Sequence, residues 1–172
     1  LAEYQPGFEL YLQFDSLRDE VHQALRGARL SDVRRRALDA LNEHDVSTTL
    51  VVTVKNGLND HELGEIVEFA LGQPCVRGVT FQPIQQAGRL ENYDPARDRL
   101  TLTGVRNRIL AQTKVFAPED LIPVPCNPDC LAMAYALKFD GGVLPLTRFV
   151  SPETLVSKGR NTIVVERDEE LR

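Results

Sequence analysis

The sequence predicts an α/β fold: a partial (β/α) barrel of about three parallel strand-helix units, followed by a small C-terminal α+β extension with a hairpin. Three apolar or β-prone runs, at residues 9–14, 49–54 and 79–83, alternate with two segments whose apolar residues recur at helical spacing. Strands buried on both faces are apolar throughout. Because crossovers between parallel strands are right-handed, we expect the three strands to lie side by side, with both helices on one face.

The first helix is predicted over residues 31–44. Ser31 or Asp32 is available as its N-cap. The apolar stripe that indicates this helix consists of Leu30, Val33, Ala37, Leu38 and Leu41.

The second helix, over residues 60–71, has the clearest pattern in the chain. Asn59 and Glu62 have the spacing of a capping box at its start, and Gly72-Gln73-Pro74 ends it. Its apolar stripe consists of Leu63, Ile66, Val67, Ala70 and Leu71.

The pattern changes after residue 85, so we divide the chain into a partial barrel, 1–85, and an extension, 86–172. Within the extension we expect a loop over 86–99 and a helix over 103–113 capped by Thr103. The proline-rich stretch 123–130 predicts irregular structure. Segments 131–138 and 143–149 flank Asp140-Gly141-Gly142, which is typical of a hairpin.

Composition and charge restrict the class of protein. The 172 residues include 25 acidic and 20 basic side chains, and the net charge of −5 argues against nucleic acid as a partner. The run Arg34-Arg35-Arg36 is interpreted as the solvated face of a helix. The apolar stretches are too short for a transmembrane segment. Three cysteines, an odd number, indicate a reducing compartment, and we expect a cytoplasmic protein.

Polar side chains follow each predicted strand. In barrels of parallel strands, the loops after the carboxyl ends of the strands form the working face. These side chains therefore predict one shared site for a polar ligand, although loops commonly begin with polar residues in any case. They are Gln13, Asp15 and Ser16 after the first strand, Thr53, Lys55, Asn56 and Asn59 after the second, and Gln82, Gln85, Gln86 and Arg89 after the third.

Two phrases of the sequence resemble the radical S-adenosylmethionine superfamily. One runs from Leu12-Gln13-Phe14-Asp15-Ser16 to Leu25-Arg26-Gly27, and the other is Asn56-Gly57-Leu58-Asn59-Asp60-His61-Glu62-Leu63 after the second strand. Relatives in molybdenum-cofactor and tetraether-lipid synthesis carry "strand, S-L-D, helix, R-G" before "strand, G-x-N-D-x-E-I, helix". The resemblance spans roughly residues 4–150.

The resemblance implies an enzyme that uses a [4Fe-4S] cluster and S-adenosylmethionine to generate a deoxyadenosyl radical. The CxxxCxxC motif that holds this cluster does not occur in the sequence, which opens Leu1-Ala2-Glu3 and has Met133 as its sole methionine. We therefore expect a C-terminal part of a longer protein, inactive alone and without cofactors of its own.

The family's motifs also imply which residues bind S-adenosylmethionine. Asp15 matches the aspartate of "S-L-D", and Gln13 stands in place of the serine. Asn59, Asp60 and Glu62 match "N-D-x-E", although good capping residues at the start of a helix are an alternative explanation for them. The expected cofactor-binding residues are Gln13, Asp15, Ser16, Thr53, Asn59 and Gln82.

Cys126 and Cys130 form a second candidate site, for a metal. Relatives that make tetraether lipids carry a similar "P-C-x-H-P-x-C" phrase where auxiliary clusters are bound, so the two thiols are candidate cluster ligands. Iron–sulfur clusters usually need four thiolates, so further ligands would have to come from elsewhere. The alternative is a pair of reduced structural thiols.

A second function remains open: a non-catalytic module that binds a substrate or a partner, with Gln82, Arg89 and the hairpin as its surface. The substrate, a small molecule or a lipid, is not indicated by the sequence. An exposed barrel edge favours strand pairing with a second copy, and hence a homodimer.

Overall fold

The structure is a computed structural model that describes residues 3, 8–85, 93–124, 131–139 and 142–158. The chain divides into two compact units, Leu1–Gln112 and Thr113–Arg172. Each unit is described by itself below.

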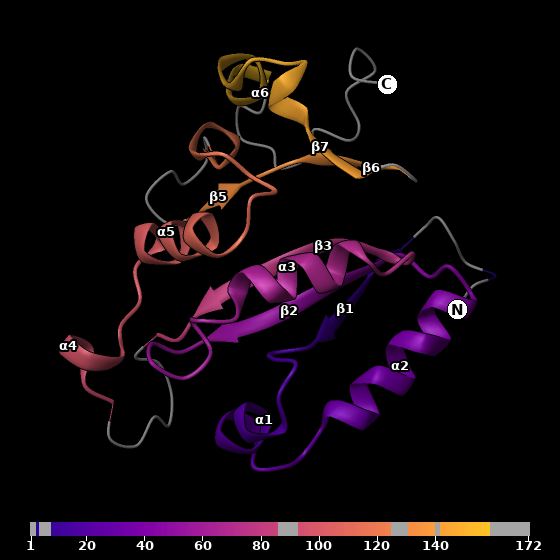
Figure 1. The fold of residues 1–172 in the computed structure, drawn as a ribbon, viewed down its shortest axis with the longest axis vertical. Helices are drawn as coiled ribbons and strands as arrows, with labels where there is room; N and C mark the ends of the chain where they lie inside the picture. The colour runs from indigo at the N-terminus through magenta and orange to yellow at the C-terminus, as the bar shows by residue number, and fades with distance from the viewer. Residues whose placement is uncertain (1–2, 4–7, 86–92, 125–130, 140–141, 159–172) are drawn as a thin grey trace. The chain divides into compact units, whose positions relative to one another are not determined.

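The first unit contains a three-stranded parallel sheet in the order β1-β2-β3 (Figure 1). Its strands are β1 (Leu10–Gln13), β2 (Thr48–Val54) and β3 (Val76–Pro83). This arrangement confirms the predicted α/β fold with parallel strands. Within the described residues the sheet stays open and does not close into a barrel. The third strand begins earlier than predicted, because Val76 already pairs with Thr48.

Three helices connect these strands. The helices α2 (Ser31–Glu43) and α3 (Leu63–Leu71) confirm the two that the apolar stripes predict. The helix α1 (Asp19–Arg26) is too short to show such a stripe, but it lies where the family phrase has its helix before "R-G". Gly27 ends it with φ of 73°, a left-handed conformation that glycine adopts at little cost.

The predicted N-caps of both long helices are wrong. Neither Ser31 nor Asp32 caps α2; instead the Asp19 carboxylate accepts a hydrogen bond from the Ser31 N–H at 3.0 Å. Asn59 and Glu62 form no capping box on α3, because no side chain caps this helix. Both side chains are engaged elsewhere, as described with the candidate site.

A further short helix and a longer one follow β3. The helix α4 (Pro95–Asp98) lies in the stretch predicted as a loop, and the Asp94 side chain caps it. The helix α5 (Leu102–Gln112) confirms the one predicted over 103–113. Its first turn is closed by Thr101, whose hydroxyl accepts from the Gly104 N–H at 3.1 Å, and not by Thr103.

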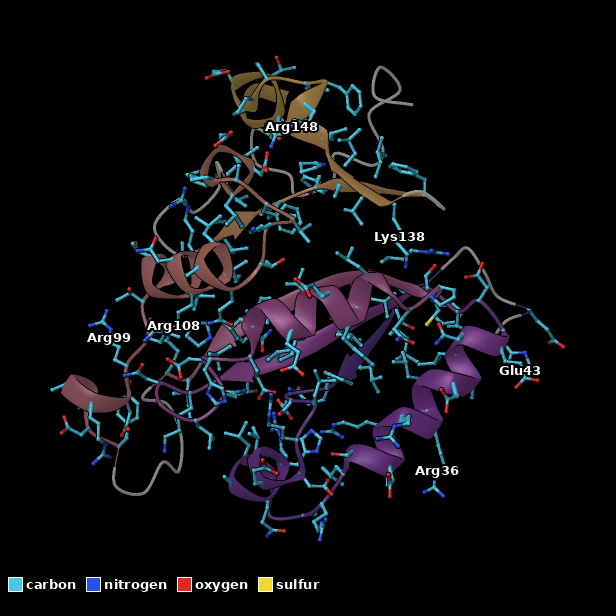
Figure 2. The ribbon with its side chains drawn as sticks, viewed as in Figure 1. Arg36, Glu43, Arg99, Arg108, Lys138 and Arg148 are labelled. Atoms are coloured by element: carbon cyan, nitrogen blue, oxygen red, sulfur yellow. The ribbon has the colours of Figure 1, made fainter. Side chains whose placement is uncertain are left out.

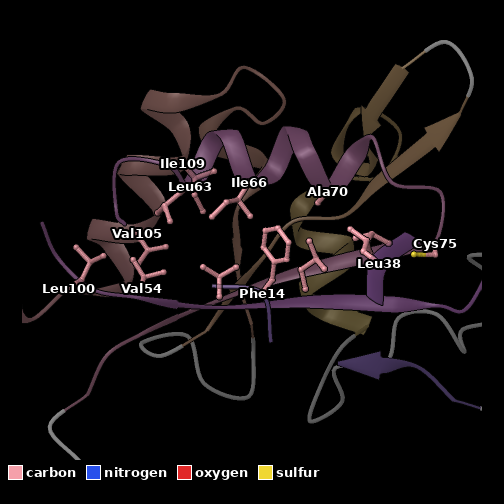
Figure 3. Close-up of a cluster of buried hydrophobic side chains, with 13 residues drawn as sticks. Phe14, Leu38, Val54, Leu63, Ile66, Ala70, Cys75, Leu100, Val105 and Ile109 are labelled. Atoms are coloured by element: carbon pink, nitrogen blue, oxygen red, sulfur yellow. The ribbon is translucent and has the colours of Figure 1, made fainter. Parts of the chain in front are cut away.

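The core of the first unit lies on one face of the sheet. Alternate residues of β2 face α3 across it, and Figure 3 shows Ile66 and Ala70 of α3 above Phe14. Leu38 brings α2 to the same face, as predicted, whereas Val33 of the predicted stripe is 50% exposed. The core consists of Phe14, Leu38, Leu50, Val52, Val54, Leu63, Ile66, Ala70, Cys75, Val76, Leu100, Val105 and Ile109.

The second unit holds two small antiparallel sheets. The strands β6 (Ala136–Phe139) and β7 (Gly142–Pro145) confirm the predicted hairpin, in a shorter form. The strands β4 (Ile122–Pro123) and β5 (Ala132–Met133) pair with each other, so regular structure reaches Pro123, where the sequence predicts none.

Helical segments complete this unit. They are η2 (Pro118–Asp120), η3 (Leu146–Arg148) and α6 (Pro152–Lys158). Buried Asp120 joins η2 to η3, because its carboxylate accepts from the Ala117 N–H at 2.6 Å and from the Thr147 hydroxyl. Among the helices of the described residues, none has the length and apolar character needed to cross a membrane.

Candidate functional site

Five of the six residues predicted to bind cofactor meet at the carboxyl ends of β1 and β2. Asp15 and Ser16 follow β1 directly, and Gln13 is its last residue. Thr53 lies near the end of β2, and Asn59 is in the turn before α3. The parallel register that aligns β1 with β2 brings these segments together.

Asp15 is the centre of this cluster. Its buried carboxylate accepts five hydrogen bonds from described residues. Arg26 donates two of them, from Nε at 2.8 Å and Nη2 at 2.9 Å, in a bidentate geometry. The others come from Gln13 Nε2 at 2.7 Å, the Thr53 N–H at 3.1 Å and Arg34 Nη2 at 3.3 Å.

These donors keep Asp15 ionised. Burial alone would raise the pKa of the carboxyl, but hydrogen bonds from Arg26, the Thr53 N–H and Gln13 outweigh it and lower the pKa to about 2. The backbone of Asp15 has φ of 63°, a left-handed conformation that aspartate tolerates better than most residues. The chain thus turns sharply after β1 and directs the carboxylate back toward β2.

Gln13, Thr53 and Gln82 share the sheet face opposite the core. Thr53 is paired with Gln82 in the register of β2 and β3, and Gln13 Nε2 lies 3.4 Å from Thr53 Oγ1. Gln13 and Thr53 are half-buried, and Gln82 is exposed. One polar row therefore crosses all three strands near their carboxyl ends.

Asn59 joins the ends of β1 and β2. Its Nδ2 donates to the Asp15 carbonyl at 3.1 Å and to the Thr53 carbonyl at 2.8 Å, and its Oδ1 accepts from the Lys55 N–H at 2.9 Å. The side chain is completely buried. Asn59 uses its amide to fix the backbone around Asp15 and Thr53.

Ser16 and Glu62 form a second buried link between β1 and α3. The Ser16 hydroxyl donates to Glu62 Oε1 at 2.6 Å, and Arg18 Nη1 donates to Glu62 Oε2. Arg18 also pairs with Glu65 at 2.7 Å. Both carboxylate oxygens of Glu62 therefore accept hydrogen bonds from residues of the turn after β1.

Asp60, the remaining member of the "N-D-x-E" phrase, connects the turn after β2 to α5. Its Oδ2 accepts from Arg108 Nε at 2.6 Å, and Arg108 Nη2 donates to Asn56 Oδ1 at 2.8 Å. Figure 2 labels Arg108 beside this turn. The hydrogen bonds from Arg108 therefore attach the turn that contains Asn59 to α5.

Two arginines belong to this cluster although the sequence predicts no role for them. One is Arg26, which forms part of the "R-G" phrase. The predicted solvated face is wrong for Arg34, because its side chain is only 13% exposed. Arg35, in contrast, is 69% exposed, and Arg36 points away from the sheet (Figure 2). The signal was present, because Arg34 lies four residues from both Leu30 and Leu38 and thus within their stripe.

The cysteines fall outside this cluster. Cys75 is buried in the core, where burial raises the pKa of its thiol. Cys126 and Cys130 lie outside the described residues, as do Gln86 and Arg89. Of the side chains that the structure describes, no three His, Cys, Asp or Glu residues are grouped so that they could hold a metal ion.

Comparison with known proteins identifies a similarity that extends over most of the chain. The chain is similar to the 7,8-dihydro-6-hydroxymethylpterin dimethyltransferase of Methanocaldococcus jannaschii, with 27% identity over 187 residues. The alignment covers 94% of this chain and 36% of that protein, so the chain spans about a third of the length of its curated relative. No protein-family model matches the chain.

Proposed function

We propose that this chain is part of a radical S-adenosylmethionine enzyme and contributes side chains that bind S-adenosylmethionine. The observation that carries the proposal is the polar row of Gln13, Thr53 and Gln82 near the carboxyl ends of three parallel strands. Ligand sites of parallel α/β folds lie at this end of the strands. The similarity to a dimethyltransferase supports the proposal, because such an enzyme needs a methyl donor.

The buried residues of the cluster have a structural role in this proposal. They are Asp15, Ser16 and Asn59. Their side chains are buried and fully engaged with protein groups, so they fix the turn that presents Gln13 and Thr53. Gln13, Thr53 and Gln82 keep exposed surface and are the residues that we propose to touch the ligand.

The residues of this chain do not fit the catalytic iron–sulfur cluster. The sequence contains no CxxxCxxC, and Cys75 is enclosed in the core. In this superfamily the cluster supplies the electron that makes S-adenosylmethionine a source of radicals. We propose that a longer polypeptide provides the cluster ligands, and that Cys126 and Cys130 serve an auxiliary cluster there.

The name of the relative also suggests a class of substrate. We propose a small polar heterocycle, such as a pterin, rather than a lipid, and a cytoplasmic location for the enzyme. Within the described residues, the two edges of the three-stranded sheet are unpaired. We propose that such an edge pairs with a second copy, and the oligomeric state in solution tests this.

Two measurements test the proposed function. The 172-residue chain should form no deoxyadenosine from S-adenosylmethionine after anaerobic reconstitution with iron and sulfide, because it lacks the cluster ligands. The natural polypeptide that contains these residues should form deoxyadenosine under the same conditions and should bind S-adenosylhomocysteine in calorimetry. Turnover by the 172-residue chain alone would contradict our placement of the cluster. A natural polypeptide that neither binds nor turns over would instead favour the non-catalytic binding module.

A further inference from the structure

We infer that a segment near the C-terminus, residues 162–166, binds to one face of the β6–β7 hairpin and covers the exposed side chains of Leu137 and Phe139. The hairpin face is thus an interaction surface whose occupant is an extended apolar segment of the same chain. The contact is independent of the proposed function, because none of these residues belongs to the Asp15 cluster or to the polar row.

The hairpin presents apolar side chains on one face. Leu137 is 53% exposed and Phe139 is 55% exposed, and both lie on the same face of β6 because alternate residues of a strand share a face. Leu144 is opposite Leu137, but the residue opposite Phe139 is Gly142, which has no side chain to cover the ring. Among the described residues of the hairpin only Pro145 is buried, and it lies on the other face. The exposed face is therefore apolar, whereas a solvated sheet face is normally polar.

Exposed apolar side chains are concentrated in the second unit. Among the described residues, six large hydrophobic side chains are exposed, and four of them lie in this unit. A two-stranded hairpin has little stability by itself in water and depends on packing against a further element. The hairpin is therefore a surface that an additional apolar segment would stabilise. The four exposed side chains are Leu131, Leu137, Phe139 and Phe149.

The sequence after α6 supplies such a segment. Residues 159–172 lie outside the described residues. Within them, residues 162–166 read Thr-Ile-Val-Val-Glu, so four β-branched residues follow one another, which is typical of an extended segment that packs on a sheet. The other segments outside the described residues contain no three consecutive aliphatic side chains. Of these segments, residues 159–172 therefore fit an apolar face best.

Spacing and reach both fit the contact. In an extended conformation Ile163 and Val165 point the same way, as the two exposed side chains of β6 do, so two pairs of apolar side chains can meet. Residues 159–161 separate the run from α6 and span about 10 Å when extended. The seven residues of α6 are about 10 Å long, so a chain that reverses after α6 returns to the start of this helix. The start of α6 follows the hairpin through η3 (Figure 1).

Amide hydrogen exchange of the 172-residue chain tests the contact. Residues 162–166 should exchange at least about tenfold more slowly than the same sequence in a free peptide, because docking restricts their backbone. Phe139→Ser and Ile163→Ser should each return the segment to the exchange rate of its peptide. The matched controls, Ala136→Ser and Val164→Ser, change the opposite face of each segment and should keep the protection.

A second measurement decides the matter if Phe139→Ser fails to fold, which its thermal unfolding curve shows. By uncovering the hairpin face, Ile163→Ser should raise the fluorescence of the dye ANS, which binds exposed apolar surface, whereas Val164→Ser should not. Unchanged ANS fluorescence in Ile163→Ser, unprotected residues 162–166 in the wild type, or protection that persists in a folded Phe139→Ser variant would overturn the inference. Protection that increases with protein concentration would mean that the segment of a second copy occupies the hairpin, and this too would overturn it.

Discussion

At the scale of single residues, Asp15 makes folding sensitive to acid. Its folded-state pKa of about 2 lies below the ordinary value of 3.8, so its contribution to stability is complete above about pH 4 and is lost as the pH falls through 2. A difference of this size corresponds to about 2 kcal/mol in the free energy of unfolding. Asp15→Asn should lack that part of the acid loss in urea unfolding at pH 4 and pH 2.

The control for this measurement is Asp39→Asn, which changes an exposed carboxylate on α2. It should lose as much stability between the two pH values as the wild type does. An equal acid loss in Asp15→Asn would show that the ion pair with Arg26 does not lower the pKa of Asp15.

The sequence predicted which residues would gather but not how they would interact. Gln13, Asp15 and Thr53 were expected at one end of a parallel sheet because strand ends can be read from apolar runs. The pairing of Asp15 with Arg26 and Arg34 could not be read in this way, because it depends on where α1 and α2 lie against the strand ends. Long arginine side chains reach buried partners from positions that appear polar in the sequence.

At the scale of helices and strands, α3 and α5 approach each other closely at Gly64. Because of this, we expect Gly64→Ala to lower the free energy of unfolding, although alanine favours a helix more than glycine does. A Cβ on Gly64 would lie 2.6 Å from the Cβ of Gln112. Gly64→Ala would ordinarily favour a helix by up to about 1 kcal/mol. Here we expect it to destabilise the protein by about 1–3 kcal/mol, because overpacking forces the helices apart.

Thermal and urea unfolding measure this effect. Glu68→Ala changes an exposed position on the same helix and should alter the free energy of unfolding by less than about 0.5 kcal/mol. A stabilised Gly64→Ala variant would mean that α3 and α5 are not packed as the structure shows.

Periodicity predicted the longer elements and missed the short ones. The helices α2 and α3 carry apolar stripes long enough to recognise, whereas α1 has eight residues and α4 has four. The predicted capping box is wrong because Asn59 and Glu62 have suitable side chains for capping but form hydrogen bonds elsewhere in the fold. Such competition between local and distant hydrogen bonds leaves no signal in sequence spacing.

At the scale of the whole molecule, the extent of the first folding unit can be tested by truncation. The boundary after residue 85 stays a prediction of the sequence, but Leu100, Val105 and Ile109 belong to the core of the first unit. We expect residues 1–112 to unfold cooperatively and residues 1–85 to lose cooperative unfolding, as followed by circular dichroism during urea titration. Cooperative unfolding of 1–85 alone would show that α5 is dispensable.

The assembly of the Asp15 cluster also sets an order of events during folding. Its donors come from β1, α1, α2 and β2, and the bond to Thr53 closes a loop of 38 residues. Closing such a loop costs conformational entropy before any contact across it can form. We therefore expect the Asp15 carboxylate to be desolvated only after the sheet has formed. Asp15→Asn should then accelerate unfolding and leave the folding rate almost unchanged, so stopped-flow chevron plots should give a φ-value near zero. The contacts that fix the turn after β1 would then form later than the sheet itself.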